Sequence, residues 1–137
     1  MSFQELHTPL FLIVNSGLVV LIWMVQLIVY PSFLFYNKEN LVYWHNVYTK
    51  RIAVIVVPLM LIQLVISILN TIISFSIINL TIGLLVLFLW VFTFKSFAPV
   101  HFKISENRFQ QTQLQQLVNR NWIRTIIWSL ILGLSLL

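Results

Sequence analysis

The side chains best suited to chemistry gather around a pair of histidines. In "YWHNVYTKRI", His45 and Tyr48 share a helical face and Arg51 lies beside them, while in "FAPVHFKI" Pro99 interrupts an apolar run and His101 follows it. Imidazole and phenol groups are common proton-transfer groups in enzymes. We therefore take His45, Tyr48 and His101 as candidate catalytic residues.

A single arginine lies inside an apolar run in "LVNRNWIRTIIWSL", residues 117 to 130. An ionisable side chain at such a position costs free energy in hydrocarbon, so Arg124 is a candidate functional residue. Its planar guanidinium suits carbonyl oxygens, a carboxylate or the acidic group of a ligand. The alternative is a helix anchor, in which Arg124 snorkels to a loop carbonyl or a lipid phosphate.

Helical spacing predicts that this arginine faces other helices. One face of the last helix carries Leu114, Leu117, Asn121, Arg124, Thr125 and Trp128. In the first apolar run, Asn15 and Gln26 also share a face, and a buried amide needs a hydrogen-bonding partner. The predicted polar pocket combines the three candidate catalytic residues with the candidate ligand-binding residues Gln26, Arg51, Asn121, Trp122 and Arg124. Against it, single His and Trp residues at a membrane surface often serve only as anchors.

The elements that must position these residues are membrane helices. Hydrophobic residues make up 60% of the 137 residues and charged residues only 8%, which does not suit a soluble domain. At about 1.5 Å per residue, the longer apolar runs match a hydrocarbon core roughly 30 Å thick. The sequence predicts one all-α domain over 1–137, a four-transmembrane-helix bundle with an amphipathic cytoplasmic helix leading into the fourth span. The predicted spans cover residues 9–30, 52–69, 77–94 and 121–137.

The basic residues predict the orientation. All eight fall in or beside residues 31–51 and 95–121, which lie on one side of a bundle of four spans. The positive-inside rule makes that side cytoplasmic and places both termini outside, in a bacterial inner membrane. The expected partners are the lipid bilayer and a hydrophobic small molecule, and a homo-oligomer is compatible with the sequence. Nucleic acid is excluded because there is no soluble basic domain to bind it.

The sequence offers little for metals. It has no cysteine, and Glu39 and Glu106 have no ligand-like spacing to a histidine, so no non-haem metal site is expected. The cofactor is left open. A haem iron held by His45 and His101 is a further interpretation of the two histidines.

A resemblance extends this interpretation. The segments "WMVQLIVYPSF", "HNVYTKRIAVIVVPLM", "APVH" and "NRNWIRTIIW" resemble a family of small four-helix bacterial membrane proteins. More distantly, the chain is similar to the four-helix bacterial protoporphyrinogen oxidases, through Trp23, Pro31 and the segment "RIAVIVVPLM". It has Ser16 where those oxidases carry a histidine early in helix one. The resemblance implies a four-helix architecture and porphyrin-like ligands.

Together these features predict a membrane protein whose cytoplasmic-side pocket binds, and in one version oxidises, a hydrophobic or porphyrin-like small molecule. Such a protein would be an oxidoreductase. The alternatives are a non-enzymatic transport or channel subunit and a membrane assembly factor. A transport path needs polar groups through the midplane, where Asn15, Gln26, Gln63 and Asn79 are candidates, whereas a pocket needs them at one end.

Overall fold

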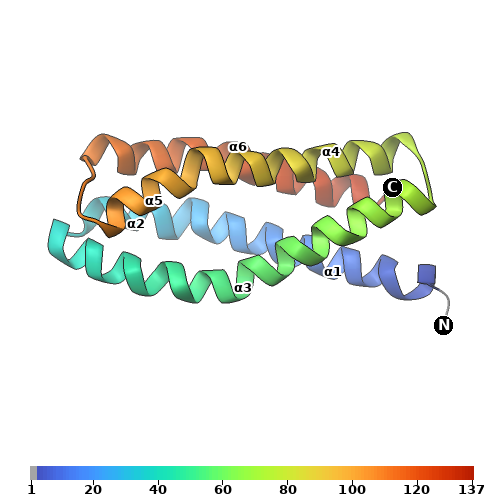
Figure 1. The fold of residues 1–137 in the computed structure, drawn as a ribbon, viewed down its shortest axis with the longest axis horizontal. Helices are drawn as coiled ribbons and strands as arrows, with labels where there is room; N and C mark the ends of the chain where they lie inside the picture. The colour runs from blue at the N-terminus through green and yellow to red at the C-terminus, as the bar shows by residue number, and fades with distance from the viewer. Residues whose placement is uncertain (1–2) are drawn as a thin grey trace.

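The computed structural model describes residues 3–137, with side chains from residue 7 onward, and the regular structure in this range is entirely helical. Four long rods run antiparallel along the bundle (Figure 1). The first rod joins α1 (Phe3–Met24), η1 (Val25–Val29), α2 (Tyr30–Ser32) and η2 (Phe33–Phe35), the second is α3 (Lys38–Ile73), the third joins α4 (Ile77–Phe92), η3 (Thr93–Phe97) and α5 (Ala98–Ser105), and the fourth is α6 (Gln111–Ser135). The all-α prediction is therefore confirmed.

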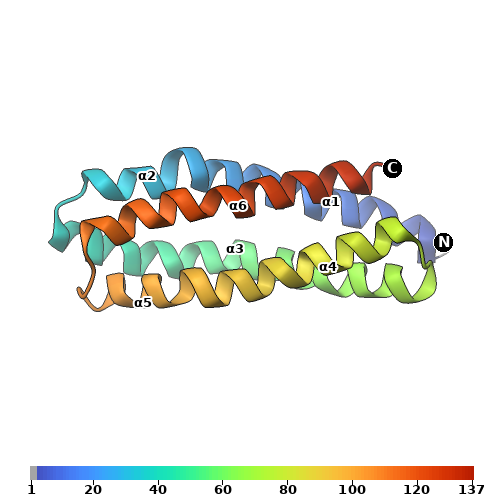
Figure 2. The ribbon, with the colours of Figure 1, turned by 90° about the horizontal axis from the view of Figure 1, so that it is seen from above.

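The four rods form a closed ring of neighbours. The helix α1 packs against α3 and α6, and α4 also packs against α3 and α6, as Figure 2 shows from above. The segments 31–51 and 95–121, predicted as connections between spans, are largely helical, and only residues 36–37 and 106–110 separate the rods there. The hydrogen bonds of a helix form between backbone groups whatever the side chains are, so each rod stays helical beyond the end of its apolar segment.

Side-chain caps define where two rods begin. Asn37 precedes α3, and its side-chain oxygen accepts a hydrogen bond from the backbone N–H of Asn40 at 2.8 Å. Ser76 precedes α4 and accepts from the backbone N–H of Asn79 at 3.0 Å. Each bond satisfies a donor that has no partner inside its helix. The short turns are therefore encoded locally.

The first and third rods each contain one π-helical turn near the same end of the bundle. The turn η1 ends two residues before Pro31, and η3 ends two residues before Pro99. A proline lacks the N–H for the regular helical bond, and its ring clashes with the preceding turn, so a widened turn relieves the conflict. Pro58 lies inside α3 without such a turn. The two π-turns set the direction in which the next side chains point.

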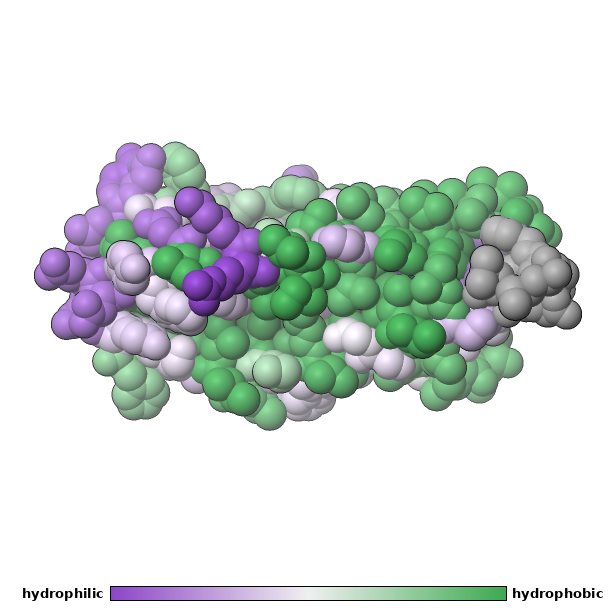
Figure 3. Space-filling model, turned by 90° about the horizontal axis from the view of Figure 1, so that it is seen from below, coloured by the Kyte–Doolittle hydropathy of each residue, from purple (hydrophilic) through white to green (hydrophobic). Residues whose placement is uncertain are grey.

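Three rods are long and apolar enough to cross a membrane: His7–Phe35, Lys38–Ile73 and Ile77–Ser105. Large apolar side chains on them face outward, with Val54 75% and Ile77 80% exposed. On the face of the bundle that Figure 3 shows, hydrophilic residues gather at one end and hydrophobic residues cover most of the rest. The fourth rod, α6, is not among these three.

The helix α6 turns its predicted stripe into the bundle. Leu114, Leu117, Asn121, Arg124, Thr125 and Trp128 are all buried. The helix begins with a capping box between Gln110 and Gln113. Helical periodicity thus identifies the inward face of this rod correctly.

Candidate functional site

A cavity of about 270 Å³ lies between the first and third rods and α3, near the hydrophilic end of the bundle. We call it the arginine cavity, because Arg124 of α6 reaches its wall. Its polar lining residues are Tyr30, Tyr48, Thr49, Thr93, His101 and Arg124, and its apolar lining residues are Leu21, Val25, Ile52, Ala53, Val56, Phe94, Phe97 and Ala98. Polar groups thus converge on an otherwise apolar space, as they do in small-molecule sites.

Arg124 is the unusual member of this lining. It is 7% exposed, and its guanidinium carbon lies 4.5 Å from the ring centroid of Phe97 and 5.2 Å from that of Trp128. Such stacking over aromatic faces stabilises a cation. Its Nε atom has no hydrogen-bond partner. Among the side chains of residues 7–137, the one ion pair joins Arg108 to Glu106, so Arg124 has no carboxylate partner in this range.

A chain of hydrogen bonds leads away from the cavity through both histidines. The Tyr30 hydroxyl lies 3.1 Å from His101 Nε2, His101 Nδ1 lies 2.8 Å from His45 Nε2, and His45 Nδ1 lies 3.2 Å from Ser105 Oγ. The two imidazole rings stack with centroids 5.0 Å apart. Tyr30 and His101 line the cavity, and Ser105 ends α5 at the hydrophilic end. The chain therefore connects the cavity to that end.

The donors and acceptors in this series of hydrogen bonds can be arranged in two complete ways. In one, Tyr30 donates to His101, His101 Nδ1–H donates to His45, and His45 Nδ1–H donates to Ser105. In the other every bond is reversed, and each imidazole carries its proton on Nε2. Passing one proton along the chain converts one order into the other, which is how a proton relay operates.

Tyr48 joins the site from α3. Its half-buried side chain lines the cavity, and its ring packs edge-on against Phe33 at 5.8 Å. The ring of Phe33 also packs against His45 at 5.8 Å. The three candidate catalytic residues thus lie close together, with Tyr48 and His101 at the cavity and His45 behind them.

The candidate ligand-binding amides lie deeper and bond to each other. Asn121 Nδ2 donates to Gln26 Oε1 at 3.0 Å, and Gln26 Nε2 donates to the Val118 carbonyl at 3.1 Å. Thr125 Oγ1 adds a longer contact to Gln26 at 3.4 Å. None of these residues lines the arginine cavity. Their arrangement ties the first rod to α6.

Two other predicted members lie on the outside of the bundle. Arg51 is exposed and does not line the cavity. Trp122 is 41% exposed and packs edge-on against Trp23 at 5.7 Å. The indole N–H of Trp23 donates to Ser129 Oγ at 3.1 Å. The convergence expected from the sequence therefore includes Arg124, Tyr48 and the two histidines. It leaves out Arg51 and Trp122 on the outside of the bundle, and Gln26 and Asn121, which do not line the cavity.

Sequence reasoning missed Tyr30, Thr93 and Phe97 as members of the site. Tyr30 is 3% exposed, and the Thr93 hydroxyl is buried without a hydrogen-bond partner. The sequence does contain a signal for these residues. The first and third rods each carry a proline beside the site, Pro31 and Pro99, and the residues just before each proline line the cavity.

The two histidines do not fit a haem iron held between them. Axial ligands of one haem lie on opposite faces of the macrocycle. Here the nitrogens of His45 and His101 that face each other are 2.8 Å apart, in hydrogen-bond contact, and leave no room for a macrocycle between the rings. Among the described residues there is also no group of three or more His, Cys, Asp or Glu placed to hold a metal ion.

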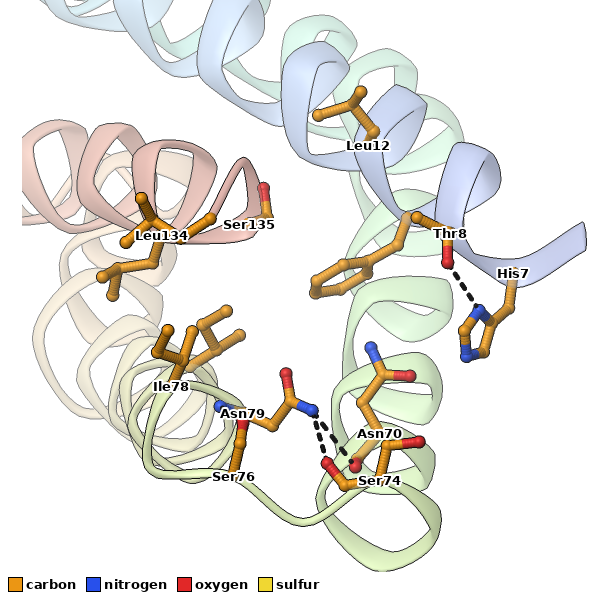
Figure 4. A pocket seen from close by; sticks show the side chains of 13 residues that line it. His7, Thr8, Leu12, Asn70, Ser74, Ser76, Ile78, Asn79, Leu134 and Ser135 are labelled. Atoms are coloured by element: carbon orange, nitrogen blue, oxygen red, sulfur yellow. Dashed lines mark hydrogen bonds between the residues drawn. The ribbon is translucent and has the colours of Figure 1, made fainter. Parts of the chain in front are cut away.

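A second pocket of about 400 Å³ lies at the opposite end, beside the start of α1 and the turn between α3 and α4. Figure 4 shows Asn79 reaching across this turn, where its Nδ2 donates to the Ser74 carbonyl at 2.7 Å and the Asn70 carbonyl at 3.5 Å. Thr8 and His7 bond to each other nearby. Among the residues whose side chains the structure describes, no Lys or Arg lines this pocket, and its main polar bonds hold the turn.

Comparison with known proteins adds no assignment. No model of a protein family matches this chain, and no curated protein or solved structure matches it.

Proposed function

We propose that the chain is an integral protein of a bacterial inner membrane, with four spans and both termini outside. Three apolar rods, outward-facing apolar side chains and hydrophilic residues gathered at one end support this proposal. The basic residues also collect towards that end, which favours a cytoplasmic location for it. The helix α6 would span as the fourth helix, shielded by its neighbours along its polar stripe.

We infer that the arginine cavity binds a hydrophobic small molecule through an acidic or oxygen-bearing group. The observation that carries this inference is the burial of Arg124 without a carboxylate among the described side chains. A buried cation without an anionic partner is costly. A ligand carboxylate, phenolate or carbonyl at the guanidinium would reduce that cost, and the cavity that Arg124 lines offers the space for one.

Proton transfer is the chemistry that this site supports best. A bound molecule with an acidic O–H or C–H beside Tyr30 could pass a proton through His101 and His45 towards Ser105. An oxidation would also require an acceptor for electrons. The proposal is therefore binding with proton transfer, and the resemblance to porphyrin oxidases stays a hypothesis about the ligand.

The transport alternative has less support. Asn15 and Gln63 are buried and bond to each other at 2.7 Å, and the Trp128 indole donates to Gln63 at 3.2 Å. Asn79 holds a turn instead. Asn15 Nδ2 has no hydrogen-bond partner, but amides that bond to one another inside a packed core do not favour a path through it. An assembly factor is a further alternative that no contact within this chain favours.

Mass spectrometry of the detergent-purified protein tests the binding proposal. We expect a small hydrophobic molecule to copurify, and Arg124→Lys to lower its occupancy roughly tenfold, because the ammonium group cannot reproduce the planar donor geometry. The matched control is Arg120→Lys, one helical turn earlier on the exposed face of α6. Full occupancy in well-folded Arg124→Lys protein would overturn the role assigned to this arginine.

A further inference from the structure

An apolar groove lies next to the arginine cavity on the outside of the bundle. It lies between α1 and α3, has a volume of about 530 Å³, and shares Leu21, Val25 and Ile52 with the lining of the cavity. Its polar lining is limited to the Ser16 side chain. Cavity and groove therefore adjoin each other, with polar groups in the cavity and an apolar lining in the groove.

The groove is open sideways. Val20, Met24 and Ile55 on its lips are 61%, 53% and 55% exposed, so a molecule within it would contact the surroundings of the bundle along its length. In a bilayer those surroundings are lipid chains. At its floor, Gly17 has no side chain, which leaves room that a larger residue would fill.

We propose that this space binds a single-chain amphiphile with one anionic head group, such as a fatty carboxylate, which enters sideways from the bilayer. The proposal rests on the proposed function and names the ligand class of the same site. The head group lies at Arg124, and the alkyl chain lies in the groove between α1 and α3.

The charges at the site favour one anion. Arg124 is the one Lys or Arg side chain in the cavity, and neither the cavity nor the groove is lined by an acidic residue. The buried hydroxyl of Thr93, which also lacks a partner, belongs to a second lining residue of the same cavity. A carboxylate accepts from both kinds of donor.

The groove favours one long chain. Its aliphatic walls suit methylene groups, each of which gains affinity when it is removed from water. A second acidic group placed along the groove would find the Ser16 hydroxyl as its one side-chain donor. A ligand with one polar end and one apolar chain thus matches the space better than a molecule with several charged groups.

Radiolabelled palmitate and octanoate, added to the full chain in neutral detergent, test the proposal. We expect palmitate to bind at least about tenfold more tightly than octanoate, and palmitic acid methyl ester to compete at least about tenfold less well than palmitate. Arg124→Lys should weaken the binding of both acids.

Substitutions in the groove test binding of the alkyl chain separately from binding of the head group at Arg124. Gly17→Leu should weaken palmitate roughly tenfold and leave octanoate unchanged. Gly17→Ala is the matched control, because a Cβ atom there meets Leu59 Cδ1 at 3.7 Å, an ordinary contact. If Gly17→Leu does not fold, Val20→Trp on the exposed lip serves the same purpose.

The outcomes distinguish the two proposals. Equal affinities for palmitate and octanoate, with silent groove variants, would overturn the chain site and leave the arginine site intact. Equal competition by palmitate and its methyl ester would overturn the role of the anion but not the proposed function, which also admits a carbonyl oxygen and is overturned if Arg124→Lys leaves ligand binding unchanged. Absence of binding by either acid would overturn the ligand class.

Discussion

The bonded pair Gln26 and Asn121 gives the sharpest prediction about stability. Gln26→Leu removes three contacts, to Asn121, Thr125 and the Val118 carbonyl. Thr125 keeps its bond to the backbone carbonyl of Asn121 at 3.0 Å, so Asn121 Nδ2 becomes buried without a partner, as Asn121 Oδ1 already is. A side-chain bond between membrane helices contributes about 0.6 kcal/mol on average, and an orphaned buried group costs about 1–3 kcal/mol. We expect a loss of about 2–3 kcal/mol in the free energy of unfolding.

The double variant Gln26→Leu with Asn121→Leu removes the orphan as well. It should be less destabilised than the sum of the single variants, with a coupling energy of about 1–2 kcal/mol from reversible unfolding in mixed micelles. The matched control is the exposed pair Gln115 and Asn119, which has the same amide types and a bond of 3.1 Å, and its coupling should be about 0.3 kcal/mol. Equal coupling energies for the buried pair and the exposed pair would refute the conclusion that the bond between Gln26 and Asn121 stabilises the packing of the first rod against α6.

Three further predictions follow from helix geometry and charge. Pro99→Ala removes the cause of the π-turn before it, so the ¹⁵N resonances of His101 should shift as its hydrogen bonds weaken; an unchanged spectrum would contradict the role of proline. Gly83→Ala should lower stability by about 1 kcal/mol, because a Cβ atom there meets Thr71 Oγ1 at 3.2 Å, while Gly133→Ala meets nothing within 4 Å and should be neutral or stabilising in thermal unfolding. Reporter fusions should place both termini outside and the connection between α5 and α6 inside; a cytoplasmic C-terminus would disprove the fourth span.

Helical periodicity explains both the success and the errors at the site. The stripe on α6 is a local property of spacing, so Arg124 is placed inward correctly. The same geometry explains the two residues that face outward. Arg51 follows His45 by six positions, about 240° around the helix axis, and Trp122 precedes Arg124 by two, about 200°. The prediction placed these two residues in the pocket because they are close to it in sequence, whereas the rotation around the helix axis determines which side chains face inward.

The cavity itself depends on features that spacing does not encode. The inward positions of Tyr30 and Thr93 depend on how the first and third rods pack and on the register change at each π-turn. Likewise, the sequence predicts that His45 and His101 lie at one end of the bundle, but their direct contact at 2.8 Å depends on the rotation of two different rods. Contacts between rods join residues far apart in the sequence, and the spacing of residues within one helix does not predict them.

The two π-turns also have a consequence for the evolution of chain length. A π-turn holds one residue more than the regular helix can absorb, and it commonly marks a single-residue insertion. If the same residues formed a regular helix instead, the extra residue in η1 or η3 would rotate everything beyond it by about 100°. Tyr30 and His101 would then no longer meet. A related chain that has a regular helix in place of either turn should therefore be one residue shorter there if it keeps the tyrosine and the histidine.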